Sequence, residues 1–237
     1  GDMDEDRLVA AQLLAQLGSA YLHLGDRERA VDYLGRAARL APNAAGIRTQ
    51  LAVGQLALGR PDQAIRELEG AVDLGQGIPQ ADLLLVLTHL QEERHDQALE
   101  AARALAEREP DDPMAYNLMG AAHLGQGDRD AARRQFEAAL ELRGDFVPAL
   151  LSLARLELRG GEREKARGRL EEVLEHQPEN GQALVLLARM AVTEARMGEA
   201  RRLLEQARKG DPNALEPRLL LTDYHLDQGR AREAEPI

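Results

Sequence analysis

Residues 113–146 read PMAYNLMGAAHLGQGDRDAARRQFEAALELRGDF, and the pattern in this stretch recurs along the chain. Its Ala132 belongs to a series of alanines that stand 34 residues apart: Ala30, Ala64, Ala98, Ala132, Ala166, Ala200 and Ala234. A period of 34 residues without insertion is typical of stacked helical hairpins, in which each unit buries its apolar face against its neighbours. The sequence therefore predicts an all-α solenoid.

The period divides the chain into six full repeats and a partial seventh. Counted from Ala11, the repeats are predicted at 11–44, 45–78, 79–112, 113–146, 147–180 and 181–214, with a partial unit at 215–237. Residues 1–10 are interpreted as a lead-in or as the end of a preceding helix. We expect residues 11–237 to be one domain, because a solenoid grows along one axis without a central core. No polar capping helix follows Ala234, so the chain is expected to be a piece of a longer array.

Fixed positions within each repeat predict how its two helices pack. The seventh residue is large and apolar: Leu17, Leu51, Leu85, Met119, Leu153, Leu187 and Leu221. The eighth is mostly small, as in Gly18 and Gly120, which lets a second helix approach closely. Glycines that accept positive φ predict the turn between the helices at Gly25, Gly59, Gly127, Gly161 and Gly229. Glu93 and Ala195 stand at this place in repeats three and six.

Composition and charge exclude several classes of protein. The 237 residues are 44% hydrophobic, 30% charged and 3% aromatic, with a formal net charge of -11. An acidic chain without a basic face is a poor partner for nucleic acid. The absence of cysteine excludes disulfides, thiolate metal sites and cysteine nucleophiles. No apolar run approaches the roughly 20 residues that span a bilayer, so we expect no direct membrane insertion.

Several residues resemble the tetratricopeptide repeat (TPR) pattern, namely Leu17-Gly18, Tyr21, Ala30, Leu34, Ala37 and Pro42, and again Tyr116, Met119-Gly120, Ala132, Phe136 and Ala139. The resemblance covers about residues 11–234. It implies a right-handed superhelix whose first helices line a concave groove, which is the usual site of protein binding in this family.

The sequence gives little support for catalysis, and we predict no enzyme activity, cofactor or metal. Its few serines and threonines stand in no recognisable nucleophile setting. His89, His123 and His225 share the eleventh position of their repeats, but equivalent residues of stacked repeats lie about 10 Å apart, too far to share one zinc ion. We interpret them as partly buried packing residues with a polar tip. Arg163, Lys165, Arg167 and Arg169 are interpreted as a solvated outer face, because glutamates are interleaved with them.

The TPR resemblance places the groove at the second, fifth, ninth, twelfth and thirteenth residues of each repeat. From these positions we predict a peptide groove that contains Thr49, Val53, Leu83, Leu87, Asn117, Leu151, Arg155, Arg159, Val185 and Arg189. Packing between neighbouring first helices is the alternative for the leucines and valines. The arginines favour an acidic partner segment held by bidentate hydrogen bonds, and pairing with local carboxylates is the alternative. A carboxylate clamp of the co-chaperone kind is disfavoured, because Lys165 and Lys209 both lie on second helices.

Four stretches resemble a narrower group, the large TPR lipoproteins of PEP-CTERM/exosortase and exopolysaccharide systems. They are Asn43–Gly59, Gln80–Leu90, Asp111–Asp128 and Leu215–Gly229. This similarity implies a location in the periplasm or cell envelope, a lipid-bearing cysteine upstream of Gly1, and a role in organising exopolysaccharide production or protein sorting.

These observations together predict a non-enzymatic scaffold that binds a protein or peptide segment in its concave groove. One alternative is a cytoplasmic regulatory or co-chaperone module. A second is the substrate-binding arm of an enzyme whose catalytic domain lies outside residues 1–237. Exposed cut ends would also allow chains to associate end to end.

Overall fold

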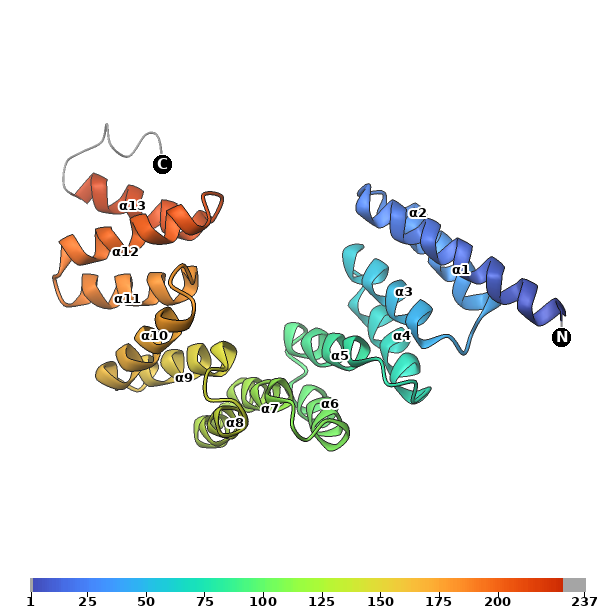
Figure 1. Cartoon of the computed structure of the whole chain (residues 1–237), viewed down its shortest axis with the longest axis horizontal. Coiled ribbons are helices and arrows are strands. Elements are labelled where there is room, and N and C mark those ends of the chain that lie inside the picture. Colours follow the sequence, from blue (N-terminus) through green and yellow to red (C-terminus); the bar gives the residue numbers. More distant parts are fainter. Residues whose placement is uncertain (1, 228–237) are drawn as a thin grey trace. The chain divides into compact units, whose positions relative to one another are not determined.

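The computed structural model describes the backbone of residues 2–227 and the side chains of residues 4–222 (Figure 1). This part of the chain forms thirteen α-helices and no strand, which confirms the predicted all-α fold. The helices are α1 (Asp2–His23), α2 (Arg27–Leu40), α3 (Ala45–Ala57), α4 (Pro61–Asp73), α5 (Pro79–Gln91), α6 (His95–Arg108), α7 (Pro113–Gly125), α8 (Arg129–Leu142), α9 (Val147–Arg159), α10 (Arg163–His176), α11 (Gly181–Thr193), α12 (Met197–Gly210) and α13 (Leu215–Asp227).

Each predicted repeat is a pair of consecutive helices, with the odd-numbered helix first. The chain divides into two compact units, which we call the N-terminal unit (Gly1–Asp111 with Ala121–Asp128) and the C-terminal unit (Asp112–Gly120 with Arg129–Ile237). Helices α1 to α6 pack in sequence order in the first unit, and α8 to α13 do so in the second. Helix α13 is the first helix of repeat seven, whereas Gly229 and Ala234 lie outside the described residues.

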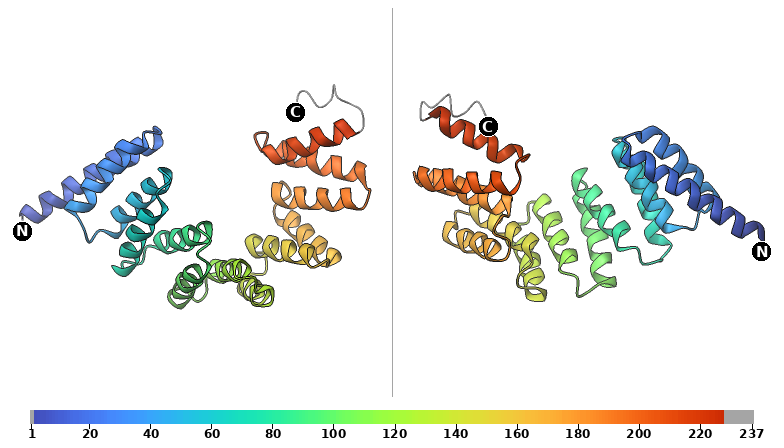
Figure 2. Two further views of the ribbon diagram at one scale, coloured as in Figure 1. Left: turned by 180° about the vertical axis from the view of Figure 1, so that it is seen from behind. Right: turned by 45° about the horizontal axis from the view of Figure 1, so that its top comes forward.

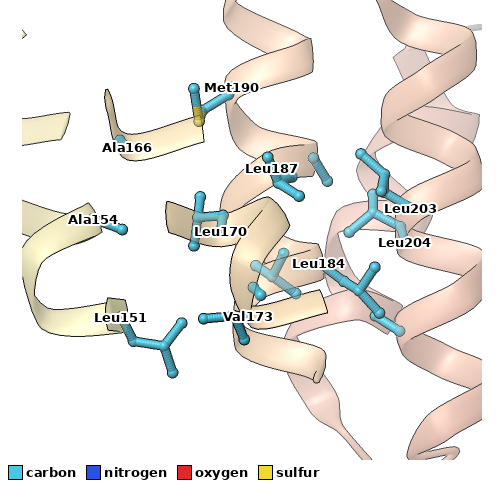
Figure 3. Packing of buried hydrophobic residues seen from close by; sticks show 14 of the residues in the cluster. Leu151, Ala154, Ala166, Leu170, Val173, Leu184, Leu187, Met190, Leu203 and Leu204 are labelled. Carbon is cyan, nitrogen blue, oxygen red and sulfur yellow. The ribbon is translucent and has the colours of Figure 1, made fainter. Parts of the chain in front are cut away.

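The core of each hairpin follows the 34-residue period. All six alanines of the series from Ala30 to Ala200 are buried, and the residue four positions later is buried with each of them. Those partners are Leu34, Leu68, Ala102, Phe136, Leu170 and Leu204. Figure 3 shows the result in the C-terminal unit, where leucines of α9, α10, α11 and α12 pack around Leu170 and Leu184. The i, i+4 stripe of each second helix is thus the surface that holds its hairpin closed.

Large and small residues complement each other where the two helices of a hairpin cross. A Cβ atom added at Gly120 would lie 2.4 Å from Cε1 of Phe136, and one added at Gly18 would lie 2.6 Å from Cγ of Leu34. Neither separation is possible between carbon atoms without movement. The absence of a side chain at these two glycines therefore sets how closely the helices approach, as the sequence predicted.

The predicted turns adopt the conformation that glycine favours. Gly25, Gly59, Gly127 and Gly161 have φ between 69° and 81°. Glu93 and Ala195 hold the same conformation, with φ of 57° and 58°. The tertiary fold therefore imposes the left-handed turn even where the residue disfavours it, at a cost of about 1–2 kcal/mol for each residue.

Gln76 stands at the thirty-second position of repeat two, where repeats one, three, five and six have a proline. Its side chain joins two successive loops. Its Oε1 accepts a hydrogen bond from the backbone N–H of Ala45 (3.1 Å), and its Nε2 donates to the carbonyl of Asn43 (2.7 Å). Ala45 is the first residue of α3, where backbone N–H groups have no partner within the helix. The amide of Gln76 thus ties the loop before α5 to the start of α3.

Ion pairs also join successive repeats. In the N-terminal unit, Arg60 binds Glu28 (3.2 Å) and Arg94 binds Asp62, with the arginine on the later repeat each time. In the C-terminal unit the arginine lies on the earlier repeat instead, as where Arg167 binds Glu194 (2.9 Å). The two pairs of the N-terminal unit are exposed, and such pairs contribute about 0–1 kcal/mol each.

Candidate functional site

A cleft between the first helices of repeats one and two is the clearest hollow at the predicted groove positions. Helices α1 and α3 lie next to each other, and the cleft between them holds about 660 Å³. Its lining includes the second, fifth, ninth and thirteenth residues of repeat one. The lining residues are Leu8, Gln12, Ala15, Gln16, Ser19, Ala20, His23, Ala44, Gly46, Ile47, Gln50 and Gln76.

The lining of this cleft is uncharged and rich in amides. Gln12, Gln16 and Gln50 are exposed, and each amide offers both a donor and an acceptor. The ring Nδ1 of His23 lies 2.7 Å from the carbonyl of Ser19 and donates to it, which leaves Nε2 for other partners. Ala15 and Ile47 supply a buried apolar floor. The cleft can therefore bond the main chain of an extended segment while placing small apolar side chains against its floor.

The groove residues predicted in the N-terminal unit differ in exposure. Thr49 is buried, and its hydroxyl donates to the carbonyl of Ala45 (2.8 Å) on its own helix. Val53 and Leu83 are half-buried, whereas Leu87 is 44% exposed. The structure therefore leaves Leu87 as the most accessible of these four side chains.

The residues predicted in the C-terminal unit separate into a buried and an exposed set. Leu151 and Val185 belong to the hydrophobic core, and the amide oxygen of Asn117 accepts a hydrogen bond from Ser152 (3.2 Å). Arg155, Arg159 and Arg189 are all exposed.

The three exposed arginines differ in their partners. Arg155 donates to the amide oxygen of Gln182 (2.8 Å), and Arg189 pairs with Glu216 (2.6 Å). Arg159 has no hydrogen bond or ion pair to any residue that the structure describes. Pairing with a local carboxylate thus accounts for Arg189, and two cations remain without a carboxylate partner.

Glu157 is a buried carboxylate that the sequence did not single out. Its side chain is 0% exposed, and Oε1 accepts a hydrogen bond from Nε of Arg169 (2.8 Å) and lies 3.6 Å from Nη1 of Arg133. Arg133 also binds Glu162 at 2.5 Å. The interpretation of Arg163, Lys165, Arg167 and Arg169 as a solvated outer face is therefore wrong for two of these residues. Arg169 binds the buried Glu157. The side chain of Arg167 is largely buried beside Glu194.

Two of the three histidines at the eleventh position, His89 and His123, have side chains that the structure describes. His89 is buried, its Nδ1 has no partner among the described residues, and burial lowers the pKa of its imidazole. His123 Nδ1 lies 3.1 Å from Oε1 of Gln126, and the side chain of His225 lies outside the described residues. No group of three His, Asp or Glu side chains in the described part of the chain could hold a metal ion.

No described helix has the length and apolar character to cross a bilayer.

Comparison with known proteins places the chain among repeat proteins. Three family models described as tetratricopeptide repeat match it, one at residues 11–44, one at 49–113 and 83–145, and one at 123–190. These matches together span most of the chain. No curated protein sequence matches it.

Solved structures share the fold at low sequence identity. Pseudomonas aeruginosa PilF is 21% identical, and the match covers 92% of this chain and 99% of that one with a TM-score of 0.66. A tetratricopeptide repeat protein from Parabacteroides merdae is 17% identical over 95% and 89% of the two chains, with a TM-score of 0.72. MamA from Desulfovibrio magneticus is 21% identical over 72% and 97%, with a TM-score of 0.61. The repeat period, the helical hairpins and the family models agree that this chain belongs to the tetratricopeptide repeat family.

Proposed function

We propose that this chain is a protein-binding scaffold that holds an extended segment of a partner protein in the cleft between α1 and α3. The observation that carries the proposal is the coincidence of the described cleft with the groove positions of repeats one and two. Tetratricopeptide repeats act generally as protein-interaction modules without catalytic residues, and the lining is suited to holding a segment in place.

The chemistry of the lining specifies the kind of segment. Glutamine amides can pair with the N–H and C=O groups of an extended main chain, which is how peptide backbones are commonly recognised. The floor formed by Ala15 and Ile47 has room for small apolar side chains. No charged residue lines the cleft, so an uncharged segment is the preferred occupant.

Filling the cleft is expected to abolish this binding. Gly46 is the second residue of α3, and a Cβ atom there would meet only Cδ1 of Ile78, at an ordinary 3.8 Å. A Gly46→Arg variant should therefore fold normally and obstruct the cleft. Short uncharged peptides selected from a random display library against the wild-type chain should bind this variant at least about tenfold more weakly in fluorescence anisotropy, a loss of about 1.4 kcal/mol.

The matched control for that experiment is Gly198→Arg. Gly198 is the second residue of α12 and has no neighbour near its Cβ position, so the same change is made at the same helical position outside the cleft. Peptides that bind Gly46→Arg as tightly as wild type would show that the cleft is not the site.

A second candidate site lies on the C-terminal unit, where Arg155 and Arg159 are exposed without a carboxylate partner. The two residues are four apart on α9, so their side chains share one face of the helix. We propose that they bind an acidic segment through bidentate hydrogen bonds to carboxylates. Arg189 contributes less, because Glu216 already neutralises it.

Reversal of both charges tests the acidic-segment site. A labelled oligoglutamate peptide should bind the wild-type chain more weakly as salt rises, and Arg155→Glu/Arg159→Glu should remove the binding. Arg163→Glu/Arg202→Glu is the control, because it changes the net charge equally on the second helices α10 and α12. Equal affinity of the two double variants would discard the site and leave only a general charge effect.

The cellular setting is a separate proposal that rests on the four sequence stretches similar to the TPR lipoproteins of PEP-CTERM and exopolysaccharide systems. We infer from them that the scaffold works in an envelope assembly. A cytoplasmic regulatory module and the binding arm of a larger enzyme are the alternatives, and both would use the same cleft.

A further inference from the structure

Helix α1 carries a continuous apolar stripe on its exposed side. Val9, Leu13, Leu17 and Ala20, with Leu24 just after the helix, follow one another at spacings of three or four residues, which places them on one face. Their large members are 53%, 61%, 40% and 79% exposed, for Val9, Leu13, Leu17 and Leu24 in turn. At about 1.5 Å per residue the stripe is about 22 Å long.

The positions of Leu13 and Leu17, the third and seventh of the repeat, are buried in the later repeats. The seventh residue of each, from Leu51 to Leu221, is buried, and so is the third, exemplified by Ile47 and Ala81. There the second helix of the preceding repeat packs against them, as α2 packs against α3. The stripe on α1 therefore continues the inter-repeat interface of this chain and has the composition to pack against a helix.

Helix α1 is long enough for a second helix to lie along its apolar stripe. The first helices of repeats two to seven are 13 residues long, whereas α1 is 22 residues long and continues without a turn from Asp2 into repeat one. Figures 1 and 2 show its N-terminal part running past α2. The stripe thus remains straight and accessible from Val9 to Leu24.

Opposite charges stand at the two ends of the stripe. Glu5 and Asp6 are exposed at its start, and Asp6 lies three residues before Val9 on the same face. At its end, after the turn that follows Leu24, Asp26 pairs with Arg29 and Glu28 pairs with Arg60, which leaves Arg27 as the exposed charge without an ion pair to a described residue. A second α1 in antiparallel orientation would place Asp6 opposite Arg27 and Val9 opposite Leu24, whereas a parallel one would place acid against acid.

We propose that two copies of this chain associate through antiparallel α1 helices around a two-fold axis near Leu17. Such an interface is self-complementary, so every contact occurs twice. It buries the one large apolar stripe of α1 and pairs both of its charged ends. Its large members Val9, Leu13, Leu17 and Leu24 do not line the α1–α3 cleft, and Ala20 is the residue at which the stripe borders that cleft.

The molecular mass in solution tests the association. Two single helices form an interface below the standard size, so sedimentation equilibrium is measured up to about 1 mM chain. The wild type should approach twice its 26.0 kDa. Leu13→Glu/Leu17→Glu should remain a monomer with unchanged helical circular dichroism, because both residues are exposed. Leu87→Glu/Leu142→Glu, at exposed leucines elsewhere, should dimerise like wild type.

Charge exchange and cross-linking test the orientation. Asp6→Arg or Arg27→Glu alone should weaken the dimer at least about tenfold, and the two together should restore it. The chain has no cysteine, so each introduced cysteine can pair only with another introduced one. Two chains with Leu17→Cys should form a disulfide with each other, whereas a chain with Val9→Cys should form one only with a chain that carries Leu24→Cys.

Three results would overturn the proposal. The first is a monomeric wild type at about 1 mM, which would leave the stripe to a helix other than a second α1. The second is a dimer that survives Leu13→Glu/Leu17→Glu. The third is a disulfide between the Val9→Cys residues of two copies. Loss of peptide binding through Gly46→Arg would leave all three measurements unchanged, so the two proposals fail separately.

Discussion

Replacing Glu157 by alanine is expected to lower the free energy of unfolding by about 3–5 kcal/mol, the usual effect of removing one member of a buried ion pair. Glu157 is fully buried, and Arg169 donates to it at 2.8 Å. The side chain of Arg169 is itself three quarters buried and would lose its one carboxylate partner among the described residues. Arg133 would lose less, because it keeps Glu162. Urea unfolding followed by circular dichroism measures the change.

A second substitution should restore most of that stability. Glu157 and Arg169 occupy the eleventh and twenty-third positions of repeat five, and the same positions of repeat six hold the buried apolar residues Ala191 and Leu203. Glu157→Ala/Arg169→Leu therefore gives repeat five the two residues that repeat six already buries at these positions. Replacing a buried ion pair by apolar residues of similar volume is often neutral or stabilising. If the double variant is as unstable as Glu157→Ala alone, the loss comes from a cavity and not from the stranded charge.

The repeat architecture could be predicted from the sequence because each of its determinants is local and recurs. The buried alanines, the large residue at the seventh position and the turn glycines each appear in several repeats, so an exception in one repeat does not hide the pattern. Glu93 and Ala195 illustrate this, because both adopt the turn conformation that the glycines of other repeats predict. The neighbouring helices impose the turn even at a residue that disfavours it.

Buried polar pairs could not be predicted, because they occur once and join different elements. The eleventh position holds Tyr21, Gln55, His89, His123, Glu157 and Ala191 in successive repeats, and nothing in that series marks the glutamate as buried. Its partner Arg169 stands in a run of alternating charges that is typical of a solvated helix. Only the packing of α8, α9 and α10 brings Arg133, Glu157 and Arg169 together.

The groove positions could be counted from the sequence, but their accessibility could not. Thr49 is at a groove position, yet its hydroxyl bonds its own helix and its side chain is buried. The cleft also includes Gln16, Gln50 and Gln76, which are not at the counted positions. Gln76 reaches the cleft because its amide ties the loop before α5 to α3, a contact between residues 31 apart in the sequence.

Complementary volumes at the eighth and twenty-fourth positions are the basis of the second large effect. The pairs in repeats one to six are Gly18 with Leu34, Ala52 with Leu68, Val86 with Ala102, Gly120 with Phe136, Ala154 with Leu170, and Ala188 with Leu204. The largest second residue, Phe136, meets a glycine, and the smallest, Ala102, meets a valine. Close-packed interiors respond even to one added methyl group, so a change of size at one residue of a pair is expected to be tolerated only when the other residue compensates for it.

Gly120→Ala is therefore expected to destabilise the C-terminal unit by about 2 kcal/mol, since about 3 kcal/mol of overpacking is offset by about 1 kcal/mol of helix propensity. Three ring atoms of Phe136 lie within 2.9 Å of the new methyl position and must move. Gly168→Ala, an exposed helical glycine without neighbours, should instead stabilise by up to about 1 kcal/mol. Gly120→Ala/Phe136→Leu recreates the alanine and leucine pair of repeats two, five and six, and its unfolding midpoint in urea should return close to that of wild type. A double variant that is less stable than both single variants would show that Phe136 is required for contacts beyond Gly120, and that pairwise volume does not control this crossing.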